Sequence, residues 1–113
     1  SADQLPWRGT PAGGGVTTAD DEVRFVEAIK AGTLIPLPLF EEAIRQQTDW
    51  YGYGFMVSGE GAARQYGHEG GAPGQNAVFR VLPETGYALV ALSNTDPDAM
   101  ENAVNGILRR LPL

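Results

Sequence analysis

The stretch NAVFRVLPETGYALVALSN, residues 76–94, constrains the fold more than any other part of this sequence. Two runs rich in β-branched, aromatic and aliphatic residues, 77–82 and 87–93, flank the turn Pro83-Glu84-Thr85-Gly86. Proline favours such a turn, and glycine accepts the positive φ that turns often require. The stretch therefore predicts a β-hairpin.

Both faces of this hairpin carry apolar side chains. In the first arm, Phe79 and Val81 point to one face, while Val78 and Leu82 point to the other, and the second arm is apolar on both faces too. An antiparallel sheet covered on one side only would leave half of these residues in water. Either the helices that precede the hairpin cover the second face, or part of the parent structure lies outside this sequence.

The segment VTTADDEVRFVEAIKAG, residues 16–32, predicts a helix with marked ends. Thr18 suits the N-cap, the acids at 20–22 suit the positive first turn, and Gly32 suits the stop. We expect one buried face. It comprises Val23, Phe25, Val26 and Ile29.

The following residues predict a short helix and then strands. A helix beginning near Pro38 has an apolar side made of Leu39, Phe40, Ala43 and Ile44. The pattern then changes to alternation, which predicts strands in WYGYGFMVSG, residues 50–59, and in ARQYGHEGG, residues 63–71.

The last element is predicted to be a helix that packs on the sheet. Asp96 suits its cap and Pro97 its first position. Its apolar residues repeat at three- and four-residue steps, namely Ala99, Met100, Ala103, Val104, Ile107, Leu108 and Leu111. The whole pattern predicts an α+β fold: an antiparallel sheet of three to four strands, two N-terminal helices and a C-terminal helix packed on the sheet.

We expect residues 1–113 to form a single domain or part of one, with Ser1–Gly15 as a flexible arm rich in glycine and proline. The chain begins without methionine, as expected of a processed product or a piece of something longer.

Several function classes lack support. The formal net charge is −6, with Lys30 as the only lysine, which argues against a nucleic-acid partner. There is no cysteine and one histidine, so we predict neither a metal site nor a disulfide. The phosphate- and dinucleotide-binding glycine motifs are absent, so no cofactor is predicted, and no apolar run is long enough to span a membrane.

The single histidine lies in QYGHEGGAPGQ, residues 65–75. Taken alone, His68 is most simply a polar residue beside a glycine-rich turn. By the same reasoning, Trp50, Tyr51 and Phe55 are interpreted as packing residues rather than as a ligand platform.

Two stretches resemble a known family. TPAGGGVTTADDEVRFVEAIKAG, residues 10–32, resembles the segment A-G-G-L-x-S-T-x-x-D-L-A-R-F of the serine β-lactamase-like family, which includes class C β-lactamases, D-Ala-D-Ala carboxypeptidases and related esterases. YGYGF and residues 66–94, followed by the closing helix, are similar to that family's C-terminal section in the same order. The resemblance covers about residues 9 to 111. It implies a partial β-lactamase-like fold and a C-terminal fragment of a longer domain.

That family uses three boxes, of which this sequence holds one. The first is a serine three residues before a lysine, yet the residue three before Lys30 is Glu27. The second is Tyr-x-Asn, and no tyrosine here has an asparagine two places on. The third is Lys-Thr-Gly or His-x-Gly, present as His68-Glu69-Gly70. The chain alone is therefore predicted to be inactive, because the nucleophile and its base are missing.

The resemblance implies roles for the residues of the third box. The backbone N–H of Gly71 corresponds to one donor of the oxyanion hole, and Gly70 and Gly71 permit close approach by a substrate. His68 stands where the family's lysine helps to polarise the tyrosine and the substrate carboxylate. If Glu69 faced the site it would disfavour anionic substrates, and if it faces away nothing follows.

Two hypotheses remain open. In the first, the chain is the C-terminal portion of a β-lactamase-like serine hydrolase that cleaves a small ester, peptide or β-lactam substrate. Its partner is then the missing N-terminal part of the domain, or a second copy bound through an exposed sheet edge. In the second, it is a free-standing non-catalytic α+β module that binds a partner or ligand. By analogy with family members, the location is periplasmic or extracellular.

Overall fold

The structure is a computed structural model that describes residues 9–113. Its antiparallel sheet has the order β1-β2-β3-β4, which is also the order along the chain. The strands are β1 (Met56–Ser58), β2 (Gln65–Ala72), β3 (Gln75–Leu82) and β4 (Tyr87–Ser93). The helices are α1 (Ala19–Lys30), α2 (Leu37–Ala43) and α3 (Ala99–Leu108), with a short 3₁₀ helix, η2 (Gly61–Ala63).

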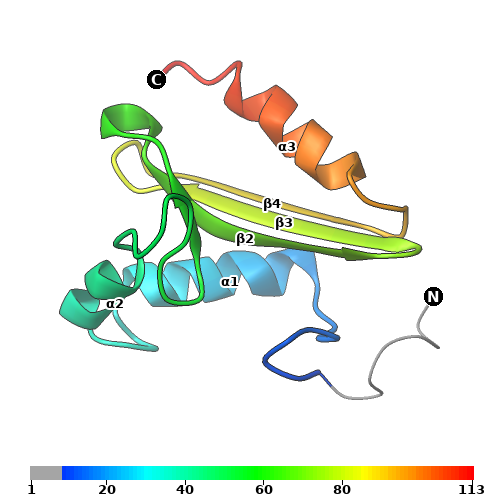
Figure 1. Cartoon of the computed structure of the whole chain (residues 1–113), viewed down its shortest axis with the longest axis horizontal. Helices are drawn as coiled ribbons and strands as arrows, with labels where there is room; N and C mark the ends of the chain where they lie inside the picture. The colour runs from blue at the N-terminus through cyan, green and yellow to red at the C-terminus, as the bar shows by residue number, and fades with distance from the viewer. Residues whose placement is uncertain (1–8) are drawn as a thin grey trace.

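The elements form three layers, with α1 and α2 on one face of the sheet and α3 on the other (Figure 1). The predicted α+β arrangement is therefore confirmed. Of the two alternatives left open for the second face of the hairpin, the structure has the first, because α1 and α2, which precede the hairpin, cover that face (Figure 1). The predicted hairpin is also confirmed, since β3 and β4 pair from Leu82 with Tyr87 to Asn76 with Ser93. Gly86 has φ 79° in its turn, and its N–H donates to the carbonyl of Leu82 at 2.9 Å.

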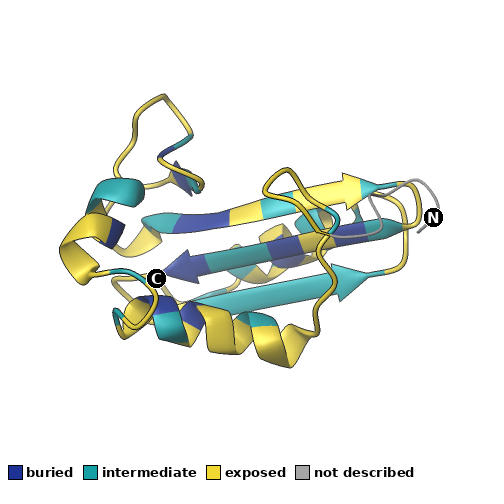
Figure 2. Cartoon of the chain, turned by 90° about the horizontal axis from the view of Figure 1, so that it is seen from below, coloured by how far each residue is buried: buried dark blue, intermediate teal, exposed yellow. Residues whose placement is uncertain are grey.

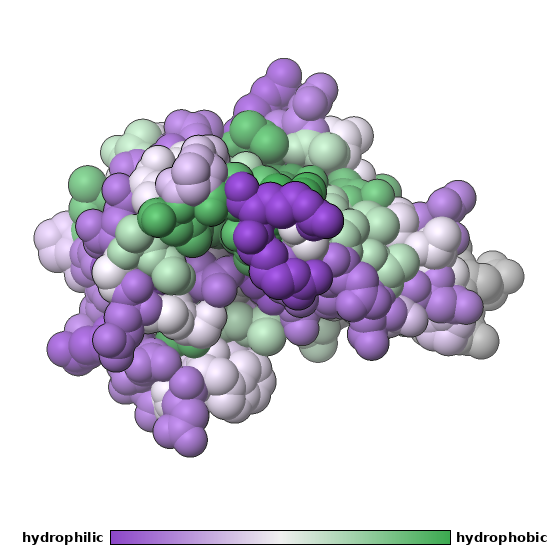
Figure 3. All heavy atoms as spheres, turned by 90° about the horizontal axis from the view of Figure 1, so that it is seen from above, coloured by the Kyte–Doolittle hydropathy of each residue, from purple (hydrophilic) through white to green (hydrophobic). Residues whose placement is uncertain are grey.

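Alternation along the strands divides the buried residues between two cores. The core between the sheet and α1 and α2 is made of Val26, Ile29, Phe40, Ile44, Val57, Tyr66 and Val81. Side chains of the opposite parity, Val78 and Leu82, are buried on the α3 side, where α3 buries Val104. Figure 2 shows the buried residues running along the middle of the sheet, and Figure 3 shows apolar residues gathered on the α3 side between polar residues.

Helix α1 has the predicted ends but a narrower buried face than predicted. The side-chain oxygen of Thr18 accepts a hydrogen bond from the N–H of Asp21 at 3.2 Å, and Gly32 has φ 71° just after the helix. Val26 and Ile29 are buried, but Val23 and Phe25 are 44% and 41% exposed, so their predicted burial is wrong. Phe25 lies to one side of this buried pair and still reaches the sheet, where its ring meets that of Phe79 edge to face at a centroid distance of 6.3 Å.

The buried face of helix α2 is also narrower than predicted. Pro38 lies in its first turn, as predicted, and Phe40 and Ile44 are buried. Leu39, which was predicted on the apolar side, is more than half exposed because it lies on the face of the helix that turns away from the sheet.

The strand predicted over residues 50–59 is mostly wrong, since only Met56–Ser58 is a strand. The preceding residues form a loop held against α2. The N–H of Tyr53 donates to the carbonyl of Ala43 at 2.8 Å, and that of Gly52 donates to the carbonyl of Phe55. A Cβ at Gly52 would lie 2.2 Å from the Ala43 oxygen, so glycine permits this contact.

The start of α3 also differs from the prediction. The helix begins at Ala99, and Asp96 does not cap it. The Asp96 carboxylate instead accepts a hydrogen bond at 2.7 Å from the N–H of Gly74, in the turn between β2 and β3. The apolar repeat extends to Leu111, which lies beyond the end of the helix.

The predicted arm lies partly outside the described residues, which begin at Gly9. Within residues 9–15, Thr10 and Gly13 exchange two backbone hydrogen bonds of 2.8 and 3.0 Å, which close a tight turn. None of the helices in residues 9–113 is both long and apolar enough to cross a membrane. The same residues contain no group of three or more histidine or acidic side chains placed to hold a metal ion.

Candidate active site

Strand β2 has a free edge next to its glycines. β1 pairs only with Gln65, Tyr66 and Gly67, so from His68 to Ala72 the outer edge of β2 has no strand partner within residues 9–113. The backbone groups that point to this edge therefore lack a strand partner, and those without another bond are open to a ligand or to another chain.

The register of the hairpin shows which backbone groups point to the free edge. β2 and β3 are joined by the two-residue turn Pro73-Gly74, which makes Ala72 and Gln75 a hydrogen-bonded pair. Hydrogen-bonded and non-bonded pairs alternate in an antiparallel ladder, so Gly71 and Asn76 form a non-bonded pair. The N–H of Gly71 consequently points away from β3, toward the free edge, as does the carbonyl of Glu69.

The side chains of the third box alternate between the two faces. Tyr66 packs in the core on the α1 and α2 side, so His68 and Gly70 share that face, and Glu69 and Gly71 face α3. The Glu69 carboxylate forms an ion pair with Arg80, which belongs to the α3 face as well. The Glu69 side chain is therefore turned to the α3 face, although the residue borders the groove on the other face.

Gly70 and Gly71 are glycines for different reasons. A Cβ at Gly70 would meet nothing within 4 Å, so glycine keeps space open on the His68 face. A Cβ at Gly71 would lie 2.3 Å from Cγ of Pro97, so glycine there lets the segment leading into α3 lie against β2.

His68 is held at both ring nitrogens. Its Nε2 lies 2.9 Å from the hydroxyl oxygen of Tyr51, and its Nδ1 lies 2.7 Å from the carbonyl oxygen of Glu69. The rings of Tyr51 and His68 meet edge to face at a centroid distance of 5.8 Å. Sequence reasoning interpreted Tyr51 as a packing residue. The residues next to Tyr51 in the sequence do not indicate a contact with His68, because the two residues are 17 positions apart and the irregular loop before β1 brings them together.

A groove of about 930 Å³ lies on this face of the sheet. It is bounded by residues 10–17, the first turns of α1, and the adjoining ends of β2, β3 and β4, and both His68 and Tyr51 line it. Phe25, Phe79 and Leu92 supply apolar surface. No lysine or arginine lines the groove within the described part of the chain.

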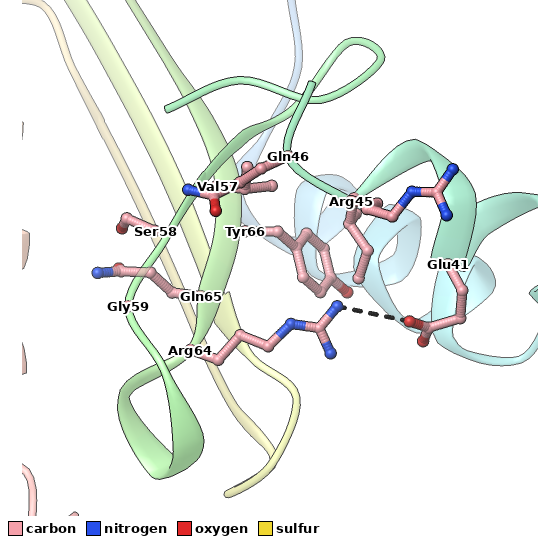
Figure 4. Close-up of a pocket in the computed structure, with 10 residues that line it drawn as sticks. Glu41, Arg45, Gln46, Val57, Ser58, Gly59, Arg64, Gln65 and Tyr66 are labelled. Atoms are coloured by element: carbon pink, nitrogen blue, oxygen red, sulfur yellow. Dashed lines mark hydrogen bonds and ion pairs between the residues drawn. The ribbon is translucent and has the colours of Figure 1, made fainter. Parts of the chain in front are cut away.

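A second, smaller cavity of about 290 Å³ lies at the other end of β2 (Figure 4). Arg64 and Glu41 pair across it at 3.5 Å. Tyr66 points its hydroxyl between them, and this buried oxygen has no hydrogen-bond partner within residues 9–113. Burial, and secondly the charges of Glu41 and Glu27, raise the pKa of Tyr66 to about 12. None of the predicted site residues lines this cavity.

Comparison with known proteins gives one match. The sequence model of the Beta-lactamase family matches residues 1–112, nearly the whole chain. Neither a curated protein nor a solved structure matches it. The match agrees with the resemblance carried by residues 10–32 and by the segment that holds His68-Glu69-Gly70. The chain belongs to the Beta-lactamase family.

Proposed function

We propose that this chain forms one wall of the active site of a β-lactamase-like serine hydrolase, with the serine nucleophile and its lysine supplied by a segment outside these 113 residues. The observation that carries the proposal is the free edge of β2. It points the N–H of Gly71 outward on the strand that presents His68 to a groove of about 930 Å³.

Three residues of β2 have a role in this proposal. The N–H of Gly71 donates to the oxygen that becomes negative when the acyl carbonyl is attacked. One such donor typically contributes about 2.7–4 kcal/mol of transition-state stabilisation. Gly70 leaves room for the acyl group, and His68 offers a polar group beside it. Lys30 does not serve as the base, since it lies on α1 paired with Glu27 at 3.0 Å.

The groove favours neutral substrates over anionic ones. No lysine or arginine among the described lining residues offers a counter-charge to a β-lactam or peptide carboxylate, and Glu22 adds a negative charge. Phe25, Phe79 and Leu92 offer apolar surface to an acyl chain. We therefore propose a small, uncharged ester as the substrate class.

A second candidate is the free-standing module that binds a ligand without chemistry. The groove favours it because residues 10–17 of the chain itself form one of its walls. This candidate predicts a stable monomer whose groove takes an uncharged ligand without any added segment.

Complementation in trans distinguishes the two. The chain alone is expected not to hydrolyse a nitrophenyl ester of a short acyl chain. Adding the segment encoded upstream of Ser1, where it carries Ser-x-x-Lys and Tyr-x-Asn, is expected to restore hydrolysis that a serine-directed acylating inhibitor blocks. In the complemented enzyme, His68→Ala is expected to lower kcat/KM by about 10²-fold or more.

The matched control is Glu60→Ala, which removes an exposed side chain outside the groove and is expected to leave kcat/KM unchanged. Hydrolysis by the isolated chain that the same inhibitor abolishes would place a nucleophile within these residues and contradict the proposal. If His68→Ala and Glu60→Ala had the same kcat/KM in the complemented enzyme, His68 would not belong to the site.

A further inference from the structure

The contacts of the His68 ring define where its hydrogens lie. The carbonyl oxygen of Glu69 can only accept a hydrogen bond, so Nδ1, at 2.7 Å from it, carries a hydrogen. In a neutral imidazole the other nitrogen is then an acceptor. The hydroxyl of Tyr51, 2.9 Å from Nε2, is consequently the donor of that hydrogen bond.

Both partners of this hydrogen bond are fixed by their own backbones. The carbonyl of Tyr51 accepts from the N–H groups of Gln47 and Thr48 at 2.9 and 3.1 Å, and its N–H donates to the Thr48 hydroxyl at 3.1 Å. On β2, the guanidinium of Arg80 donates to the carbonyl of His68 at 3.2 Å. The hydroxyl and the imidazole therefore meet in a preorganised geometry.

We propose that Tyr51 is a positioning residue that holds His68 as the neutral Nδ1–H tautomer, so that Nε2 faces the groove as a hydrogen-bond acceptor. A group with an N–H or O–H that enters the groove then takes the place of the Tyr51 hydroxyl on Nε2. A carboxylate at the same position faces the lone pair of Nε2, and because it has no hydrogen to donate it forms no hydrogen bond with that nitrogen. Tyr51 thereby contributes to the selection of uncharged, donor-bearing groups at this site.

The importance of Tyr51 for turnover rests on the proposed hydrolase function, whereas the tautomer of His68 does not. The test uses the isolated chain, in which His68 is the only histidine, so its imidazole signals are unambiguous. Long-range ¹H–¹⁵N correlation spectra at about pH 9, where imidazoles are ordinarily neutral, distinguish the protonated from the bare ring nitrogen. We expect Nδ1 to be protonated and Nε2 to be bare.

Two variants separate positioning from general packing. Tyr51→Phe keeps the ring and removes the donor, and is expected to shift the tautomer ratio toward Nε2–H by about 2- to 13-fold, the equivalent of one hydrogen bond. The matched control, Tyr53→Phe, alters a tyrosine that is 62% exposed and two residues away, and is expected to leave the ratio unchanged.

A wild-type spectrum with the hydrogen on Nε2 would overturn the inference whether or not either variant folds. So would a Tyr51→Phe ratio equal to that of Tyr53→Phe. If the tautomer is as expected and the complemented enzyme nevertheless shows no hydrolysis, the proposed function fails while the positioning of His68 by Tyr51 stands.

Discussion

At the scale of the single residue, Tyr66 links burial to pH. It is 2% exposed, and its pKa is raised to about 12, first by burial and then by Glu41 and Glu27. The unfolded chain releases the Tyr66 proton near pH 10, whereas the folded chain holds it until about pH 12. The contribution of this proton to the unfolding free energy is therefore complete below pH 10 and is lost as the pH rises toward 12. The difference corresponds to roughly 3 kcal/mol of unfolding free energy.

We expect Tyr66→Phe to remove this loss. Its hydroxyl has no hydrogen-bond partner within residues 9–113, so the unfolding free energy near pH 7 is expected to change by no more than about 1 kcal/mol. Between pH 10 and 12 the unfolding free energy of Tyr66→Phe is expected to rise relative to that of the wild type. Urea denaturation at a series of pH values measures the unfolding free energy of each protein, with the exposed Tyr53→Phe as the control. If the unfolding free energies of the wild type and of Tyr66→Phe changed in parallel with pH, the pKa of Tyr66 would not be raised by folding.

At the scale of the element, the start of α3 depends on β3. Asn76, 2% exposed, accepts a hydrogen bond from the N–H of Met100 at 2.7 Å and donates to the carboxylate of Glu101 at 2.7 Å and to the carbonyl of Gly70 at 3.2 Å. Asp98, at the N-cap position, makes no side-chain capping bond. One buried amide therefore caps the helix and ties it to the strand that carries the third box.

Asn76→Ala is expected to lower the unfolding free energy by roughly 2–4 kcal/mol, because it uncaps α3 and leaves the Glu101 carboxylate buried without its donor. Asn105→Ala, at an exposed position of the same helix, is the matched control and is expected to stay within about 0.5 kcal/mol of the wild type. Chemical denaturation measures both. Equal effects of the two substitutions would mean that Asn76 contributes no more to stability than an exposed asparagine, and would contradict its role as the cap of α3.

At the scale of the whole molecule, β4 is an unprotected edge. Its sequence YALVALS has no charge and no proline, and no strand pairs with its outer side within residues 9–113. Natural edge strands are usually protected by charges, prolines or covering segments. We propose that this edge pairs with the N-terminal part of the domain, and with a second copy when that part is absent.

The isolated chain is therefore expected to associate as its concentration rises, as measured by sedimentation velocity. Leu92→Lys places a charge on β4 where the groove leaves room, and is expected to weaken association by about tenfold or more. Leu39→Lys makes the same change on the exposed side of α2 and is expected to have no effect. A chain that stays monomeric at all concentrations would instead favour the free-standing module.

Local patterns in the sequence were sufficient for several elements. The hairpin of β3 and β4 was predictable because alternation and the turn at 83–86 are properties of adjacent residues. The ends of α1 were predictable for the same reason, since Thr18 and Gly32 act on the turns next to them. The family resemblance, carried by short segments in order, was likewise contained in the sequence and agrees with the family match.

The candidate site depended on contacts between distant residues. Asp96 bonds to Gly74, 22 positions away, rather than capping α3, and Asn76 takes its place as the cap from 24 positions away. Tyr51 reaches His68 only because its loop is bonded to α2 instead of continuing β1.

By itself, therefore, the sequence determined the family, the strands of the hairpin and the ends of the first helix, because these depend on neighbours along the chain. Only the tertiary structure decided that Glu69 faces Arg80, that the N–H of Gly71 points to a free edge and that His68 meets Tyr51. The first depends on which face β2 turns to α3, the second on the register of β2 and the short length of β1, and the third on a loop bonded to α2. All three are contacts between segments that are distant in the sequence or belong to different strands, and they are fixed only when the sheet packs between its helices.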